Sequence, residues 1–173
     1  MNELILNEAI YERITQGEIP HAENFVWIVT ADIKDMHVGH GRRFVPFLAV
    51  LAELVSNGVG VRLIHGKEPG PRFREDFDKH PALAESDLFE RILCPRVHTK
   101  CILIDGRLLY VGSANLTGAG MGAKSPNRRN FEAGIFTDDP DHVGTMMQFI
   151  DDLYLGTFCQ KCGRREHCPD PIA

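Results

Sequence analysis

The chain has 173 residues, of which 43% are hydrophobic and 25% charged, and its formal net charge is −5. This length predicts one folding unit with an appendage, and the composition excludes a disordered chain, a collagen-like fibre and a coiled coil. No apolar run approaches the ~20 residues of a membrane span, and residues 1–17 lack the layout of a secretory signal, so we expect a cytoplasmic protein with no membrane partner.

Positive charge is concentrated in one segment. Residues 91–130 carry seven Lys or Arg against a single acid, Asp105, so the segment has a net charge of +6 and the rest of the chain −11. A local cationic region on an acidic protein is typical of a site for an anionic substrate, whereas a uniformly basic coat for nucleic acid is excluded.

The first half of the chain reads as strand, helix, strand. Residues 25–33 form a short apolar run rich in β-branched and aromatic residues, which predicts a buried strand. Apolar residues at helical spacing follow, namely Phe44, Phe47, Leu48, Leu51 and Val55. We expect that helix to end at Gly58 and a second strand to run from Val59 to Leu63. This order predicts a parallel crossover and an α/β architecture.

The second half is predicted to complete the sheet. Residues 66–91 are polar and interrupted by prolines, which predicts a loop with short helices. Residues 97–104 and 108–112 read as two strands joined by a tight turn at Asp105–Gly106, and residues 131–137 as another strand. A helix with one apolar stripe should begin at Asp138–Pro140.

The predicted fold class is therefore α/β, with a mixed, largely central sheet flanked by helices on both faces. We expect residues 1–156 to form a single catalytic domain and residues 157–173 a Cys-rich tail.

Several chemically competent side chains are predicted to gather near neighbouring strands. His98 and Lys100 lie two apart in an expected strand, so both project from one face. Ser113 and Asn115 follow the next strand, and Glu132 lies at the start of the one after. The set supplies a nucleophile or proton carrier, a fixed cation, neutral donors and a carboxylate able to orient an imidazole.

This pattern resembles the phospholipase D superfamily, whose motif is His-x-Lys, four residues, Asp, six residues, Gly-Ser-x-Asn. The match runs without a departure in spacing through His98, Lys100, Asp105, Gly112, Ser113 and Asn115, and Glu132 matches the downstream Glu of the family. The motif and its flanking strands cover about 40 residues, and six positions at fixed spacing are far more specific than a lone dyad.

The resemblance implies a phosphodiester exchange that needs no metal, in which a histidine attacks phosphorus and forms a phosphohistidine. A second histidine must protonate the leaving oxygen from the opposite side, and this chain carries one motif. Small relatives with a single motif form a twofold dimer, so we expect a homodimer with a composite site. There Lys100 and Asn115 would hold nonbridging oxygens, Ser113 would assist, Glu132 would orient an imidazole, and Asp105 and Gly112 would support the motif.

The expected substrate is nucleic acid, either DNA or RNA, because short single-motif relatives are mostly nucleases, some attached to restriction and defence systems with further protein partners. Lys124, Arg128 and Arg129 could clamp a phosphate backbone, although a solvated loop is the alternative. Arg42 and Arg43 end a Gly-rich basic stretch, residues 37–43, before a helix whose amides could receive a phosphate. The rival functions are a phospholipase or phosphatidyl transferase and a catalytically silent nucleic-acid-binding or scaffold protein.

The C-terminal cysteines predict a structural metal site. Cys159, Cys162 and Cys168 have the close spacing of thiolate ligands, and the fourth ligand is Cys94, with Cys101 and His167 as alternatives. A zinc ion and a four-iron four-sulfur cluster both suit this spacing, and neither is needed for catalysis. The other interpretation is free thiols on a frayed terminus.

Overall fold

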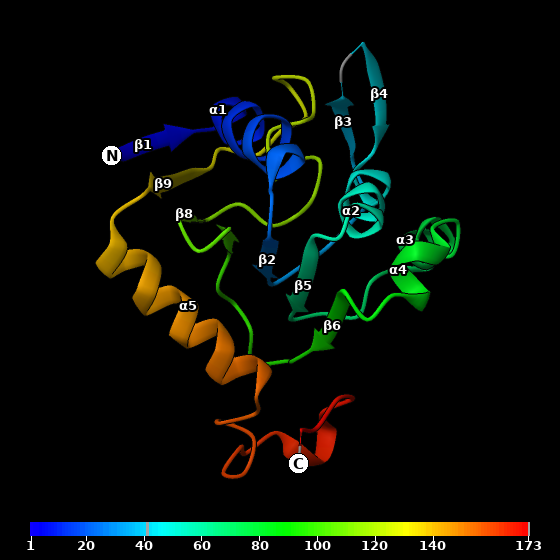
Figure 1. Cartoon of the computed structure of the whole chain (residues 1–173), viewed down its shortest axis with the longest axis vertical. Helices are drawn as coiled ribbons and strands as arrows, with labels where there is room; N and C mark the ends of the chain where they lie inside the picture. Colours follow the sequence, from blue (N-terminus) through cyan, green and yellow to red (C-terminus); the bar gives the residue numbers. More distant parts are fainter. Residues whose placement is uncertain (41, 173) are drawn as a thin grey trace.

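A mixed sheet of seven strands forms the centre of the computed structural model, which describes residues 1–40 and 42–172 (Figure 1). In sheet order the strands are β1 (Asn2–Leu6), β9 (Ala133–Thr137), β8 (Leu108–Gly112), β7 (Cys101–Ile104), β2 (Phe25–Thr30), β5 (Gly60–His65) and β6 (Phe89–Leu93). The pairs β2–β5 and β5–β6 are parallel, and the other pairs are antiparallel. The predicted fold class is confirmed.

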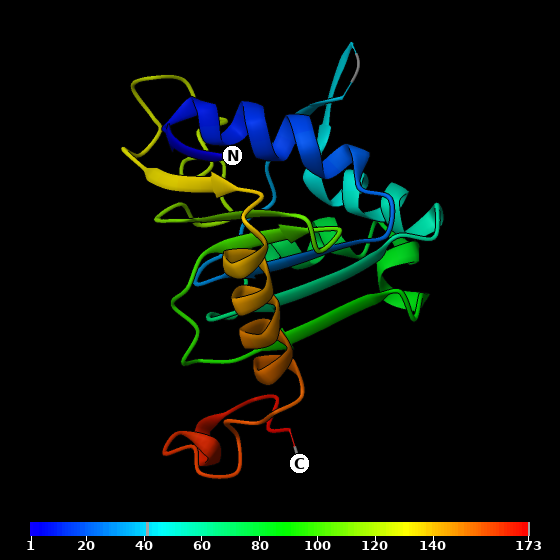
Figure 2. The same ribbon diagram turned by 60° about the vertical axis from the view of Figure 1, so that its left-hand side comes forward.

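Helices cover both faces of this sheet (Figures 1 and 2). On one face lie a helix made of α1 (Glu8–Ile10), the π-helical turns η1 (Tyr11–Glu18) and the 3-10 turn η2 (Ile19–His21), together with α2 (Phe47–Ser56), α3 (Pro71–Phe77) and α4 (Pro81–Glu85). Their apolar side chains pack with the inward residues of β2 and β5, such as Val26 and Leu63, in the larger core. The other face is covered by α5 (Pro140–Tyr154).

The helix α5 forms as the sequence predicts. Asp139 caps it, because its carboxylate accepts hydrogen bonds from the amides of Asp141 (3.0 Å) and His142 (3.3 Å). Val143 and Ile150 are buried against the sheet in a second, smaller core. This core is separated from the larger one by the sheet itself, so each face buries its own apolar side chains.

The start of the first predicted helix is wrong by one turn. Phe44 does not join the helix, because it lies in β4 (Arg43–Pro46), which pairs with β3 (His37–His40) in a separate two-stranded hairpin. The residue before a proline is disfavoured in helical conformation, so Val45 is extended and α2 can begin only after Pro46. The side chain of Phe44 is 76% exposed.

Among the described residues, four strands and one helix are absent from the predictions: the hairpin strands β3 and β4, the sheet strands β1 and β6, and the α1–η1–η2 helix. β6 begins in the segment read as a loop with short helices and extends past its end, and β1 and the α1–η1–η2 helix occupy the unassigned amino terminus. Both strands are sheet edges with few buried residues, Ile5 in β1 and Leu93 in β6, so their patterns carry little apolar signal. The helix had a readable signal in the spacing of Ile10 and Ile14, which are both fully buried.

The tail follows α5, lies below the sheet in Figure 1 and contacts the end of β6, where the Leu93 amide donates to the Asp170 carboxylate (2.8 Å). It contains the 3-10 turn η3 (Arg165–His167), and Arg165 closes the loop by donating hydrogen bonds to the carbonyls of Cys159 (3.3 Å) and Ile172 (2.8 Å). The tail is therefore an ordered loop whose ends are tied together.

Candidate active site

The reactive side chains of the motif meet at one edge of the sheet, which is formed by the neighbouring strand ends that carry them. The amide of Gly112 donates to the carbonyl of Lys100 (3.1 Å), and the amide of Ser113 donates to the carbonyl of Ala133 (3.0 Å). The carboxyl end of β2, at Thr30, reaches the same edge, since Val29 pairs with Cys101. Segments far apart in sequence thus deliver their side chains to one place.

His98 and Lys100 contact each other, but they do so outside the strand expected for them. A turn from Cys94 to Val97 containing Pro95 precedes them, so the ladder of β7 begins only at Cys101. The Lys100 ammonium lies 2.7 Å from the His98 carbonyl oxygen and 3.3 Å from each ring nitrogen. Lys100 is 9% exposed, whereas His98 is exposed, so the cation is fixed beneath an accessible imidazole.

Glu132 is held in a network with Ser113 and Asn130. The Ser113 hydroxyl donates to the Glu132 carboxylate, and the Asn130 amide donates to the other carboxylate oxygen (3.0 Å). The backbone of Glu132 is fixed by Asn7, which accepts from the Glu132 amide (3.1 Å) and donates to its carbonyl (3.0 Å). In the described part of one chain, the Glu132 carboxylate makes no hydrogen bond to His98.

Asn115 presents a free donor at the same edge. Its side-chain oxygen accepts from the amide of Asp32 (3.0 Å) and the hydroxyl of Thr30 (3.4 Å). Its NH2 group has no partner among residues 1–40 and 42–172, so it is available to an anionic ligand. The sequence gives no sign of Asn7, Thr30 or Asp32, because each forms its hydrogen bond with a residue far away along the chain.

Asp105 and Gly112 shape the strands rather than face the edge. Asp105, at φ 53°, and Gly106 make the predicted turn, and the Asp105 carboxylate accepts from the amides of Glu23, Asn24 and Phe25 at 2.7–3.3 Å. Burial raises the pKa of this carboxyl, but the three amides outweigh it and hold the pKa below its usual value. At Gly112 a Cβ would lie 2.5 Å from the Tyr110 hydroxyl, so a side chain cannot be accommodated.

The candidate nucleic-acid contacts differ in their availability. Lys124 and Arg128 are exposed, but Arg129 is half-buried and pairs with Glu8 at 3.0 Å. Arg42 and Arg43 are exposed at the β3–β4 hairpin. The expectation of a helix N-terminus directly after residues 37–43 is wrong, since that stretch forms the hairpin; Gly41 lies outside the described residues.

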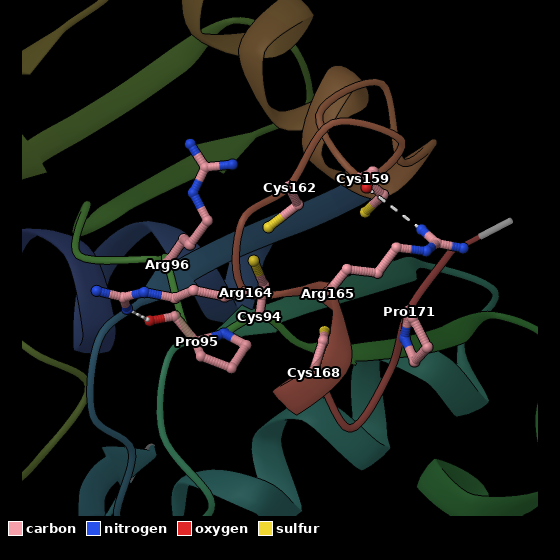
Figure 3. Close-up of a pocket in the computed structure, with 9 residues that line it drawn as sticks. All are labelled: Cys94, Pro95, Arg96, Cys159, Cys162, Arg164, Arg165, Cys168 and Pro171. Carbon is pink, nitrogen blue, oxygen red and sulfur yellow. Dashed lines mark hydrogen bonds between the residues drawn. The ribbon is translucent and has the colours of Figure 1, made fainter.

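The cysteines fall into two environments. Cys94, Cys159, Cys162 and Cys168 line one cavity of ≈ 20 Å³ between the tail and the β6–β7 connection (Figure 3). Cys101 is fully buried in β7, where burial raises the pKa of its thiol to about 12. Among the described residues, no three His, Cys, Asp or Glu side chains already stand at metal-coordinating positions.

Charge surrounds the cavity of the four cysteines. Arg96, Arg164 and Arg165 contribute to its lining. A hydrogen bond from the Arg164 amide, followed by one from the Arg96 side chain, lowers the pKa of the Cys162 thiol. The surroundings therefore favour thiolate at this position.

A second, larger cavity adjoins the first and reaches His98. It has a volume of ≈ 190 Å³ and lies between the segment before β7, the end of α5 and the tail. Its walls are formed by Cys94, Arg96, Val97, His98, Thr99, Phe149, Leu153, Phe158, Cys159 and Cys162.

No helix in the described ranges is long and apolar enough to cross a membrane.

Comparison with known proteins points to one family. The family model "Cardiolipin synthase, PLD-like domain" matches residues 16–154. No curated protein gives a significant match. Among solved structures, NucT from Helicobacter pylori is similar, with a TM-score of 0.66 at 15% identity over 89% of this chain and 95% of that chain.

Two further solved structures have the same fold. The phospholipase D family member Nuc from Salmonella typhimurium gives a TM-score of 0.62 at 12% identity, over 89% of this chain and 95% of that chain. The archaeal chromatin protein TrmBL2 gives 0.60 at 13% identity, over 88% of this chain and 51% of that chain.

Proposed function

Since the chain belongs to the family of phospholipase D-like domains, we propose that it is a phosphodiesterase that cleaves DNA or RNA without a catalytic metal. The observation that carries this proposal is the contact between the buried Lys100 ammonium and the exposed His98 ring, beside Ser113, Asn115 and Glu132 at one sheet edge. A nucleophilic imidazole next to a fixed cation and a free amide donor suits attack on an anionic phosphodiester.

The proposed reaction proceeds in two displacements. An imidazole nitrogen of His98 bonds to phosphorus while the bond to the leaving oxygen breaks, and a second imidazole protonates that oxygen. Water then attacks phosphorus, the second imidazole accepts the water proton, and the phosphorus–nitrogen bond breaks. Lys100 and the NH2 group of Asn115 hold the nonbridging oxygens, where negative charge concentrates. Glu132, held by the Ser113 hydroxyl, orients an imidazole of the site and stabilises its protonated form.

The second imidazole is proposed to come from a second copy of the chain. An apolar surface on the outer strands supports this arrangement, because Leu4 and Ile135 face each other across β1 and β9 and are 67% and 39% exposed. Leu6 pairs with Ala133, next to Glu132, and is 50% exposed. Phe131 directly precedes Glu132 and is 95% exposed. A twofold contact here would bury this surface next to both sites.

Nucleic acid is proposed as the substrate because exposed cations flank the site. Lys124 and Arg128 belong to the loop that leads into Glu132, and neither forms an ion pair in the described chain. The similar fold of TrmBL2 belongs to a chromatin protein whose structure is described as a novel mode of DNA binding, which supports nucleic acid as a partner for such a fold. A role within a DNA restriction or defence system is part of the same proposal.

We also propose that the cysteines of the tail hold a structural metal centre, either zinc or a four-iron four-sulfur cluster. This metal would have a structural role only, because no step of the proposed reaction uses a metal. The tail, residues 157–173, is then an appendage stapled to the catalytic domain, residues 1–156.

The cleavage assay tests the proposal directly. Labelled single-stranded DNA, duplex DNA, RNA and phospholipid vesicles are incubated with the protein in excess chelator. We expect cleavage of nucleic acid, lost in His98→Ala and kept in His142→Ala, whose histidine is exposed on α5. Complete dependence on magnesium would contradict the mechanism, turnover of lipid alone would favour a phospholipase, and binding without cleavage would favour a silent binding protein.

The dimer has its own test. Leu4→Glu places a charge in the proposed contact, whereas Leu155→Glu makes the same change at an equally exposed leucine, 67% in both cases, after α5. We expect Leu4→Glu to sediment as a monomer without cleavage activity and Leu155→Glu to remain an active dimer. Full activity from a proven monomer would exclude the composite site.

A further inference from the structure

We propose that Cys94, Cys159, Cys162 and Cys168 bind a single zinc ion, which fixes the tail against the segment that carries His98. The consequence for His98 rests on the proposed function, but the zinc site itself does not. Figure 3 shows the four thiol groups directed into one space from two separate parts of the chain. Cys94 comes from the β6–β7 connection and the other three from the tail.

The frame around this cavity is already held by hydrogen bonds on both sides of Cys94. The amide of Leu93 donates to the Asp170 carboxylate (2.8 Å), and the Arg164 guanidinium donates to the carbonyl of Pro95 (3.1 Å). The residues before and after Cys94 are thus each tied to the tail. The hydrogen-bonded fold therefore already bears most of the entropic cost of ordering the two segments, and the bound ion only has to bring the four thiols together.

The structure favours Cys94 as the fourth ligand over the two alternatives. Cys101 lies in the smaller core under α5 and does not line the cavity. His167 is exposed and does not line it either. Cys94 alone combines a place in the cavity wall with attachment to the tail on both sides.

The size and charge of the cavity suit one metal ion held by the four thiols. Its volume of ≈ 20 Å³ leaves room for a single ion between them. Four thiolates around Zn²⁺ leave a charge of about −2 in a tetrahedral site. Arg96, Arg164 and Arg165 line the same cavity and balance that charge.

The ion would act on the candidate active site through the larger cavity. Phe158, Cys159 and Cys162 of the tail form one wall of it, and Val97 and His98 form another. Phe158 also packs on Phe149 of α5, with ring centroids 6.3 Å apart. A tail released from Cys94 would remove that wall and loosen the chain before β7, so Cys94 is a positioning residue for His98.

The experiment measures metal content and backbone protection on the full chain. Elemental analysis of protein purified under reducing conditions should give about one zinc per chain and no iron, and replacement by Co²⁺ should give the absorption of a tetrahedral thiolate site. Cys94→Ser should lose most of the zinc and show faster amide hydrogen exchange in residues 94–99 and 157–172. Cys101→Ala should keep both properties of the wild type.

Each contrary result has a definite meaning. Iron with labile sulfide would overturn zinc, and four freely titrating thiols without metal would overturn the site. Zinc retained in Cys94→Ser but lost in Cys101→Ala or His167→Ala would overturn the ligand assignment. If Cys94→Ser fails to fold, release of one zinc on titration of wild-type thiols with a mercurial decides the question, and absence of release overturns the proposal. Cleavage enters none of these readouts, so failure of the nuclease proposal is seen separately.

Discussion

Replacement of Asp105 by Asn should lower stability and leave the chemistry intact. The carboxylate accepts from three backbone amides at the start of β2. The amides of Asn24 (2.7 Å) and Phe25 (3.0 Å) both donate to the same carboxylate oxygen, Oδ1. Asn keeps that oxygen and tolerates the φ of 53°, but its NH2 group replaces the oxygen that accepts from the Glu23 amide (3.0 Å). The variant therefore removes the negative charge together with one of the three amide contacts.

The magnitude follows from the difference between charged and neutral acceptors. Hydrogen bonds to a charged group contribute about 1.5–3 kcal/mol each and neutral ones about 0.5–1.5, so the two bonds that lose the charge cost about 2 kcal/mol, and the lost bond from the Glu23 amide adds to this cost. For a chain of this length that lowers the melting temperature by about 4–8 °C. Asp87→Asn, at an exposed turn without a side-chain hydrogen bond in the described chain, should change neither quantity.

Acid provides an internal check on the sign. The folded-state pKa of Asp105 lies below its usual value, so the charge stabilises the fold fully above the unfolded-state pKa, and this contribution is lost as the pH falls through the folded-state pKa. Urea unfolding of both proteins should therefore show a difference that is constant near neutral pH and shrinks in acid. Unchanged stability together with lost cleavage in Asp105→Asn would refute the structural role.

Two further predictions concern binding and pH. Replacing Lys124 and Arg128 together by Ala should reduce the slope of log K against log salt for duplex DNA by about 2, measured by fluorescence anisotropy, and an unchanged slope would remove the loop from the interface. Burial lowers the pKa of His65, so below pH ~6.5 the unfolded chain binds a proton at this imidazole more readily than the folded chain does. The free energy of unfolding should therefore fall below pH ~6.5, by up to ~1.4 kcal/mol per pH unit. His65→Gln should remove this component in urea unfolding, and an identical pH slope in the variant would contradict it.

The sequence was most informative where burial on both sides makes an apolar run continuous. β2, β7 and β8 lie inside the sheet and their apolar runs predict them, and β5, also inside the sheet, is predicted by the alternation of Val59, Val61 and Leu63. β1 and β6 lie at its edges, where half of each strand faces water and the pattern fades. Whether such a segment forms a strand depends on the strand that it pairs with, and the pairing is not visible in the local sequence.

The candidate site was predictable as a list of side chains but not as a network. Motif spacing identified His98 and Lys100, although they precede β7 and meet by a fold of the chain rather than by strand alternation. Asn7 and Thr30 hold the motif in place through hydrogen bonds across long sequence separations, to Glu132 and to Asn115 and Leu116. Such contacts depend on the register of the whole sheet, so local residue chemistry does not reveal them.

The covalent intermediate provides the most direct measurement of the central claim. A labelled oligonucleotide is mixed with the protein in chelator, quenched without acid during turnover, digested and mapped by mass spectrometry. The account predicts a nucleotide phosphoryl group on the peptide carrying His98, stable in alkali and lost in acid, and no adduct in His98→Ala. Cleavage that persists in His98→Ala, or an adduct on any other residue, would contradict the account.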